Sequence, residues 1–177
     1  DMLKRILFPF ALLFGLLAVP ATARDARPAH PPGVAIASAH ALATDAGLEI
    51  LREGGNAFDA AVAVSATLSV VEPVSSGLGG GGFFLLRKAG DKPAYHFLDA
   101  REKAPQAATP DMYREQPARS LDGALAAAIP GLPAALADLA SRYGRLPLAA
   151  SLAPASRMAE DGFPMYRVYR ERAGWRL

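Results

Sequence analysis

The alternation of hydrophobic and polar positions predicts two consecutive helices early in the chain. Leu42, Ala46 and Ile50 recur every four residues, the spacing of one helix face, so a helix is expected over residues 42–52. Ser38 is expected to cap it, and two adjacent glycines follow its end.

The second predicted helix spans residues 57–71. Asn56 is a favourable N-cap, and Asp59 stands three residues later, as in a short-armed capping box. This helix is rich in alanine and apolar on almost every side, so it should be buried. Glu72 precedes a proline and is therefore pushed out of helical geometry, which ends the helix.

Strands and further helices follow from the same pattern. A short buried strand is expected at residues 34–37, and a β-hairpin at residues 83–87 and 94–99, because a polar Gly- and Pro-containing turn separates two apolar runs. The remaining expectations are an irregular exposed stretch (105–117), a helix or turn (120–128), a helix starting at Pro133 and running to 143, a helix at 147–161 kinked or restarted at Pro154, and an interrupted element at 165–177.

The first residues have the pattern of an export signal. Two basic residues precede an apolar run at 6–19, and Ala21-Thr22-Ala23 supplies the small residues of a cleavage site. We therefore expect a signal peptide at 1–23 cleaved after Ala23, a proline-rich linker at 24–33, and a domain at 34–177 in a periplasmic or secreted protein. An uncleaved N-terminal anchor is the alternative, but the apolar run is too short and interrupted for a stable membrane span.

Composition excludes several classes of protein. The 177 residues contain no cysteine, which excludes thiol catalysis and cysteine-based zinc sites and agrees with an exported enzyme stabilised by its core alone. The net charge is only +2, with acids and bases interleaved, so no nucleic-acid partner is expected.

Residues 72–86, EPVSSGLGGGGFFLL, are the most unusual stretch. Five glycines fall within six positions, which indicates either a linker or a special backbone path, including one whose N–H groups bind an anion. Gly77, Gly79 and Gly82 match a dinucleotide fingerprint, but here a helix precedes and a strand follows. The fingerprint requires the reverse order, so nucleotide binding is rejected.

Few other residues suggest chemistry. The three histidines (His30, His40 and His96) lack metal-ligand spacing, so no metal or other cofactor is expected. Ser75 and Ser76 lack the context of a nucleophile elbow. The acids Asp59, Glu72 and Asp99 cannot be paired from sequence.

Arg101 is the strongest candidate. It follows the second strand of the hairpin, between the carboxylates of Asp99 and Glu102. One interpretation is a surface ion pair of small energetic value. The other is a fork that binds a substrate carboxylate through two parallel hydrogen bonds.

Four segments, in this order, resemble the N-terminal part of gamma-glutamyltransferase, also called gamma-glutamyltranspeptidase or glutathione hydrolase. They are SAHALATDAGLEILREGGNAFDAAVA (38–63), VVEPVSSGLGGGGF (70–83), LDAREKAP (98–105), and residues 129–164 with IPGLPAAL, RYGRLP and LAPASRMAEDGFP. The resemblance covers nearly all of the expected mature chain.

The resemblance implies an α/β (α+β) fold of the N-terminal-nucleophile hydrolase type, an αββα sandwich of which this chain holds the N-terminal portion. Such a precursor cleaves itself and exposes a threonine that attacks a gamma-glutamyl amide such as glutathione. The acyl group then passes to water or to an amino acid or peptide. By this resemblance Arg101 binds the alpha-carboxylate of the gamma-glutamyl group. The glycine loop resembles a backbone support near the active-site cleft, rather than an oxyanion hole.

The nucleophile segment is not found in this sequence, so no catalytic residue is assigned within it. We expect the chain to be the front part of a large subunit, inactive alone, whose partners are a small-molecule substrate and the small subunit of the same precursor. Two alternatives remain open: a related acylase or capsule transpeptidase, and a non-catalytic exported remnant. The sequence departs from the family at Ala100, where a glycine is usual, and at Val74, where a histidine is common.

Overall fold

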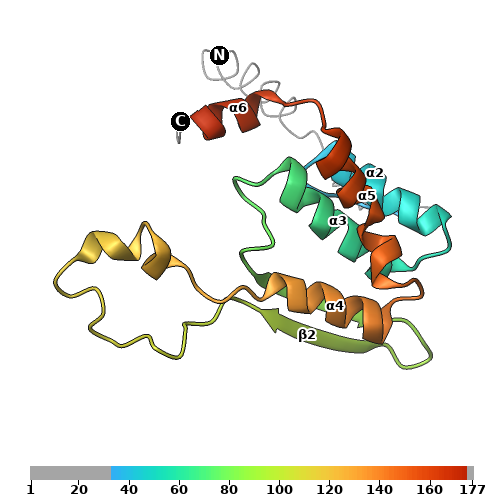
Figure 1. Ribbon diagram of the computed structural model, residues 1–177. Coiled ribbons are helices and arrows are strands. Elements are labelled where there is room, and N and C mark those ends of the chain that lie inside the picture. The colour runs from blue at the N-terminus through green and yellow to red at the C-terminus, as the bar shows by residue number, and fades with distance from the viewer. Residues whose placement is uncertain (1–32, 175–177) are drawn as a thin grey trace, which may run out of the picture. The chain divides into compact units, whose positions relative to one another are not determined.

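The computed structural model describes residues 33–174 (Figure 1). The chain divides into two units, Asp1–Ala35 and Ile36–Leu177, and only residues 33–35 of the first are described. The expected signal peptide at 1–23 and nearly all of the linker at 24–33 lie outside the described residues. The strand expected at 34–37 is wrong: these residues have no regular secondary structure and are exposed for the most part, and neither described strand pairs with them.

The first two helices lie close to their predicted bounds. They are α2 (Ala41–Arg52) and α3 (Ala57–Val71). The cap of α2 is His40, whose Nδ1 accepts the N–H of Leu42 at 3.2 Å. Ser38, the expected cap, instead donates its hydroxyl to the His40 carbonyl at 2.8 Å.

The predicted capping box of α3 is confirmed. Asn56 Oδ1 accepts the N–H groups of Phe58 and Asp59 at 2.8 and 3.2 Å, and Asp59 Oδ2 accepts the N–H of Asn56 at 2.8 Å. Asp59 is fully buried and also accepts the N–H groups of Arg145 at 2.9 Å and Leu146 at 3.3 Å. One carboxylate therefore caps a helix and fixes a segment that lies far along the chain.

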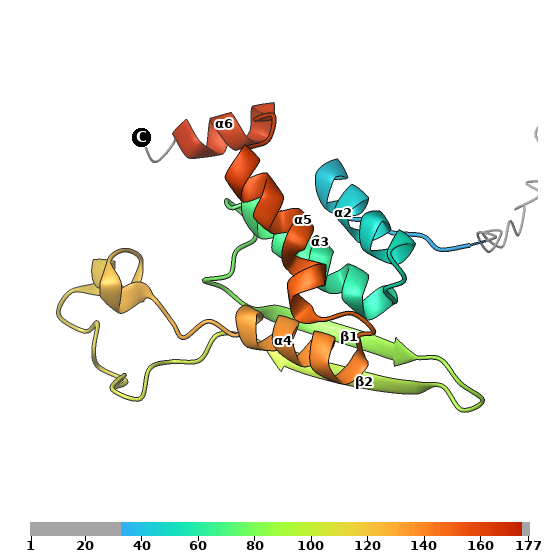
Figure 2. The same ribbon diagram turned by 45° about the vertical axis from the view of Figure 1, so that its right-hand side comes forward.

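Helix α3 packs between α2 and α5 (Leu148–Asp161), and it is buried as predicted (Figure 2). Small residues allow this close packing. A Cβ added to Gly47 of α2 would lie 2.7 Å from Ile36 Cδ1 and 2.8 Å from Val64 Cγ2, so only glycine fits there without displacing a neighbour. No helix within residues 33–174 is long and apolar enough to cross a membrane.

The predicted hairpin consists of β1 (Gly82–Lys88) and β2 (Ala94–Ala100), which pair antiparallel from Gly82–Ala100 to Lys88–Ala94. One face packs against α4 (Leu132–Tyr143), which lies along the strands in both ribbon views (Figures 1 and 2). The core joins this face to the helices; its buried members are Val62, Ala66, Leu86, Leu132, Leu136, Leu139, Ala140 and Ala155.

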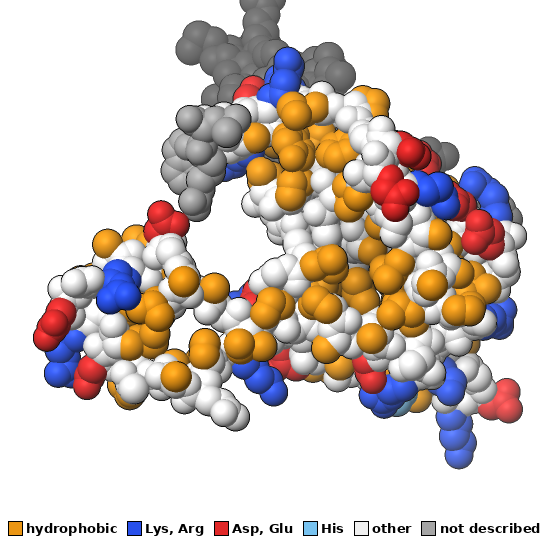
Figure 3. Space-filling model, in the orientation of Figure 1, with side chains coloured by type: hydrophobic (Ala, Val, Ile, Leu, Met, Phe, Trp, Pro, Cys, Tyr) orange, Lys and Arg blue, Asp and Glu red, His pale blue; other side chains and the backbone are white. Residues whose placement is uncertain are grey.

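Residues 104–128 form an arm that projects away from the core, drawn yellow in Figure 1. It contains two 3₁₀ turns, η1 (Pro117–Ser120) and η2 (Ala124–Ala126), where the sequence predicted an irregular stretch and then a helix or turn. A bridge closes its base: Lys103 and Ile129 exchange backbone hydrogen bonds of 3.1 and 2.8 Å. Hydrophobic, basic and acidic side chains lie side by side on its surface (Figure 3).

Three helices complete the described chain. Helix α4 has Pro133 in its first turn and ends before Gly144, as predicted. Helix α5 runs continuously through Pro154, so the proline does not restart it. The tail, expected as an interrupted element, contains a regular helix, α6 (Arg167–Gly174), supported by an ion pair between Arg167 and Glu171 at 2.6 Å.

Candidate active site

The glycine loop joins the end of α3 to the start of β1, which confirms the helix-then-strand order that argued against a dinucleotide site. None of its glycines has a positive φ. Their function here is close approach: a Cβ on Gly81 would lie 3.0 Å from both Arg101 Cα and Glu102 N. The Gly80 carbonyl accepts N–H groups from Gly131 and Leu132, each at 3.1 Å. The loop therefore clamps the end of β2 to the start of α4.

Ala100 occupies the centre of this clamp. It is 5% exposed, and Gly131 approaches it so closely that a Cβ there would lie 2.7 Å from its carbonyl carbon. Ala100 is the last residue of β2, and no non-glycine residue in the described part of the chain has a positive φ. The departure from the family's usual glycine is therefore accommodated without backbone strain at this position.

The clamp places Arg101 at the surface immediately after the strand. Asp99 Oδ1 accepts the Arg101 N–H at 2.9 Å and fixes the backbone turn. Glu102 Oε2 lies 3.5 Å from Arg101 Nε, and the arginine side chain is 61% exposed. Within residues 33–174 neither terminal nitrogen of the guanidinium has a hydrogen-bond or ion-pair partner. The terminal nitrogens that can bind a carboxylate through two hydrogen bonds are therefore unpaired within the described part of the chain.

The Glu102 side chain is more deeply buried than that of Arg101. Its side chain is 25% exposed, and its Oε2 is buried without a hydrogen-bond partner inside the described part of the chain. A Cβ on Gly80 would lie 3.3 Å from its Oε1, so the carboxylate rests against the glycine loop. Glu102 therefore lies between the glycine loop on one side and the Arg101 guanidinium on the other.

A cleft of about 480 Å³ lies beside Arg101, between the end of β2 and α4. Its volume is in the usual range for small-molecule sites. Three basic side chains (Arg101, Lys103 and Arg142) and two acids (Asp99 and Asp138) line it, while its floor is apolar. A small anionic or zwitterionic ligand would suit this lining.

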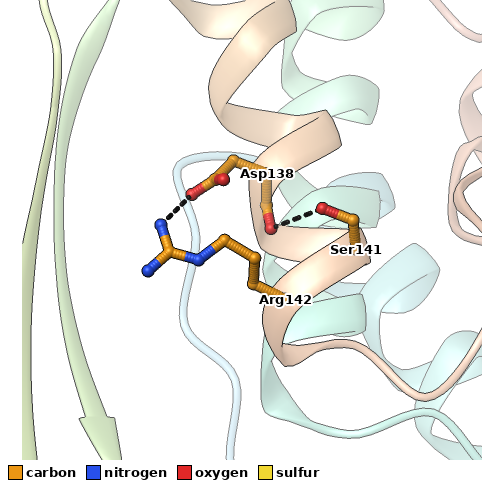
Figure 4. A network of polar contacts seen from close by, with 3 residues as sticks. All are labelled: Asp138, Ser141 and Arg142. Carbon is orange, nitrogen blue, oxygen red and sulfur yellow. Dashed lines mark hydrogen bonds and ion pairs between the residues drawn. The ribbon is translucent and has the colours of Figure 1, made fainter.

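The two charged residues that α4 contributes are paired with each other. Arg142 Nη1 lies 3.0 Å from Asp138 Oδ2, and the Asp138 carbonyl accepts the Ser141 hydroxyl at 3.2 Å (Figure 4). The Arg142 guanidinium also lies over the Tyr143 ring, 5.2 Å from its centroid. Arg142 is therefore paired with residues of its own helix, whereas the terminal nitrogens of Arg101 have no partner in the described part of the chain.

The other predicted candidates have structural contacts. His40 caps α2 and contacts Tyr166 edge to face at 4.9 Å, and His96 lies 5.7 Å from the Tyr143 ring. His30 is outside the described residues. In residues 33–174 no cluster of three His, Asp or Glu side chains could hold a metal ion. Ser75 and Ser76 sit in the turn after α3, where their N–H groups donate to the Glu72 carbonyl.

Two contacts were not predicted from the sequence. Asp59 accepts hydrogen bonds from Arg145 and Leu146, which the capping box alone does not reveal. Glu72 accepts a hydrogen bond from the Tyr166 hydroxyl, and this bond, with burial and the nearby negative charge, raises the pKa of Tyr166 to about 12. Both are long-range contacts, so no local pattern indicates them.

Comparison with known proteins identifies the family. A family model described as gamma-glutamyltranspeptidase matches residues 43–176. The glutathione hydrolase proenzyme of Escherichia coli is 44% identical over 134 residues, which covers 72% of this chain and 23% of that protein. The crystal structure of Helicobacter pylori gamma-glutamyltranspeptidase superposes with a TM-score of 0.77 at 36% identity, covering 84% of this chain and 44% of that one. The transpeptidase CapD of Bacillus anthracis gives 0.66 at 32% identity, covering 82% and 45%.

This chain spans about a fifth to a quarter of the length of the curated relatives that it matches. The structural neighbours confirm the predicted fold class, a mixed α and β fold of the N-terminal-nucleophile hydrolase type, of which residues 33–174 supply one hairpin and helices. The chain belongs to the gamma-glutamyltranspeptidase family.

Proposed function

We propose that this chain is part of an exported gamma-glutamyltransferase that cleaves gamma-glutamyl amides such as glutathione. The acyl group would pass through a threonine outside this chain to water, an amino acid or a peptide. The threonine would be exposed by self-cleavage of a precursor, giving a small subunit as the partner of this chain. The family membership and the glutathione hydrolase relatives support this proposal.

Arg101 is proposed to bind the alpha-carboxylate of the gamma-glutamyl group. The observation that carries this role is the open edge of its guanidinium at a cleft of suitable size, with Glu102 beside Nε. A planar carboxylate can accept two parallel hydrogen bonds from this edge. Within this chain the residue binds substrate and takes no part in bond cleavage; no catalytic residue, metal or cofactor is assigned.

The test is steady-state kinetics of the full-length protein with a gamma-glutamyl anilide. We expect Arg101→Ala to lower kcat/KM roughly 30- to 150-fold, which corresponds to a loss of about 2–3 kcal/mol of transition-state stabilisation. The change should appear mainly as a higher KM, because a charge-assisted contact to the donor is lost. Arg167→Ala is the matched control, since the Arg167 side chain is also largely exposed (73% against 61% for Arg101) and its ion pair within residues 33–174 is with Glu171 on α6. Unchanged kinetics of Arg101→Ala would show that the arginine is not the donor site.

A capsule-type transpeptidase is the second candidate, favoured by the similarity to CapD. The two differ in their donor. A gamma-glutamyltransferase should prefer glutathione over a polymeric gamma-linked donor of equal concentration, and a capsule-type enzyme should show the opposite order. Competition between the two donors on one enzyme preparation separates them.

A further inference from the structure

Lys103 is a second cation in the cleft beside Arg101, and the proposed function gives it no role. Both residues line the cleft, and only Glu102 separates them in the chain. Two residues span no more than about 7 Å of backbone, so the two side chains start from neighbouring points of the same wall.

The backbone of Lys103 is held in place. Its N–H donates to the Ile129 carbonyl at 3.1 Å, and its carbonyl accepts the Ile129 N–H at 2.8 Å, which closes the base of the arm. Arg101 is held in turn by the hydrogen bond from its N–H to Asp99 Oδ1. Backbone contacts at both residues therefore set the spacing between the two cations.

The other charged groups of the cleft already have partners. Arg142 and Asp138 form an ion pair of 3.0 Å within α4 (Figure 4), and Asp99 Oδ1 accepts the Arg101 N–H. The Lys103 ammonium, by contrast, has no hydrogen-bond or ion-pair partner among residues 33–174. Arg101 and Lys103 can therefore receive two anionic groups of one ligand.

A gamma-glutamyl amino acid carries two carboxylates at a suitable separation. The first is the alpha-carboxylate that Arg101 is proposed to bind, and the second belongs to the amino acid that cleavage releases. In an extended chain of bonds of about 1.5 Å the two lie roughly 8 Å apart, which is close to the backbone spacing of the two cations. The flexible four-carbon stem of a lysine can absorb the difference, and its compact ammonium suits a single-point contact with a carboxylate.

We propose that Lys103 binds the free carboxylate of the leaving amino acid, so that the enzyme favours gamma-glutamyl amino acids over donors with a neutral leaving group. This rests on the proposed function, because Arg101 is taken as the site of the first carboxylate. It selects a narrower class of substrate than gamma-glutamyl amides in general. Lys103 determines specificity in this role and takes no part in bond cleavage.

The test compares two donors that differ only in this charge, gamma-glutamyl-glycine and gamma-glutamyl-glycinamide. Competition between them for the full-length protein gives the ratio of their kcat/KM values directly. This ratio also reflects the reactivity of the two leaving groups, so the informative quantity is its change on substitution. At low ionic strength, Lys103→Gln should lower the ratio about two- to fivefold, the range for one exposed charge pair, and Lys103→Arg should largely preserve it.

Lys92→Gln is the matched control. Lys92 is an exposed lysine in the hairpin turn, at the opposite end of the paired strands from Ala100, and its substitution should leave the ratio unchanged. The ratio is also a readout that a merely structural role of Lys103 would not move. A general disturbance of the fold would lower the turnover of both donors together.

The possible failures are distinguishable. If Lys103→Gln and the unmodified protein give the same ratio while both turn over the two donors, the proposal for Lys103 is overturned and the proposed function stands. An equal fall in the ratio for Lys92→Gln would also overturn it, because the effect would then depend on net charge alone. No turnover of either donor by the unmodified full-length protein would refute the proposed function, and this proposal with it.

Discussion

Gly131 lies directly against the backbone of Ala100: a Cβ at Gly131 would be 2.7 Å from the Ala100 carbonyl carbon and 3.0 Å from the Arg101 carbonyl oxygen. The contact joins the start of α4 to the end of β2, immediately before the candidate substrate-binding residue. Since both sides of the contact are backbone, neither can move aside like a flexible side chain.

Gly131→Ala in the full-length protein should therefore lower the free energy of unfolding by about 1–3 kcal/mol, as overpacking usually does. Gly79→Ala is the matched control, because nothing lies within 4 Å of a Cβ at Gly79 and its φ is not positive. Urea unfolding measures both variants. Equal stability of the two would show that the close approach is not required.

Replacing Ala100 with glycine, the usual residue of the family at this position, tests whether the alanine disturbs the candidate site. Ala100→Gly should leave KM for a gamma-glutamyl donor unchanged, because no positive φ is needed at this position. It should lower the free energy of unfolding by about 0.5–1 kcal/mol, since glycine gains more freedom in the unfolded chain. An improvement in KM would mean that the alanine perturbs the site.

Asp59→Ala should be strongly destabilising. The carboxylate is fully buried and accepts backbone N–H groups from Asn56, Arg145 and Leu146, which the substitution would leave unpaired. A loss of about 3 kcal/mol in the free energy of unfolding is expected. Asp45→Ala on the exposed face of α2 should change it by less than about 0.5 kcal/mol. Similar values for the two variants would refute the anchoring role.

The Tyr166 hydroxyl should ionise late. Its hydrogen bond to Glu72, together with burial and the negative charge of that carboxylate, raises its pKa from 10.0 to about 12. Because the folded pKa lies above the unfolded one, the contact's contribution to stability is fully present below pH 10 and is lost as pH rises toward 12.

Ultraviolet titration of tyrosinate, compared between the unmodified protein and Tyr166→Phe, isolates this group. The difference should titrate near pH 12, and Glu72→Gln should move it toward 10. A difference that titrates near 10 in the unmodified protein would show that the hydrogen bond does not form in solution.

The sequence predicted most of the helices and the hairpin because the features that indicate them involve residues close together in the chain. The Asn56–Asp59 capping box, the spacing of Leu42, Ala46 and Ile50, and the turn between two apolar runs each depend on a few neighbouring residues. The predicted strand at 34–37 was wrong because a strand needs a neighbouring strand to pair with, and a run of hydrophobic residues does not show that one is available. His40 replaced Ser38 as a cap because its ring nitrogen reaches the first turn.

For the candidate site, the sequence indicated Arg101 and the glycine loop separately. It could not show that Gly80 and Gly81 clamp the backbone around Ala100, or that Gly131 completes the clamp, because these contacts join segments that are far apart in the chain. The sequence indicated a special backbone path for this loop, and the structure shows that close approach of other backbone groups, with no positive φ angle, is what its glycines permit.

The most direct test of Arg101 as the carboxylate-binding residue varies enzyme and donor together. The kcat/KM of full-length protein and of its Arg101→Ala variant would be measured with a gamma-glutamyl anilide and with the alpha-methyl ester of the same donor. The unmodified protein should prefer the free carboxylate by at least about tenfold, worth about 1.4 kcal/mol, and the variant should lose this preference. A preference of equal size in both proteins would contradict the assignment of Arg101.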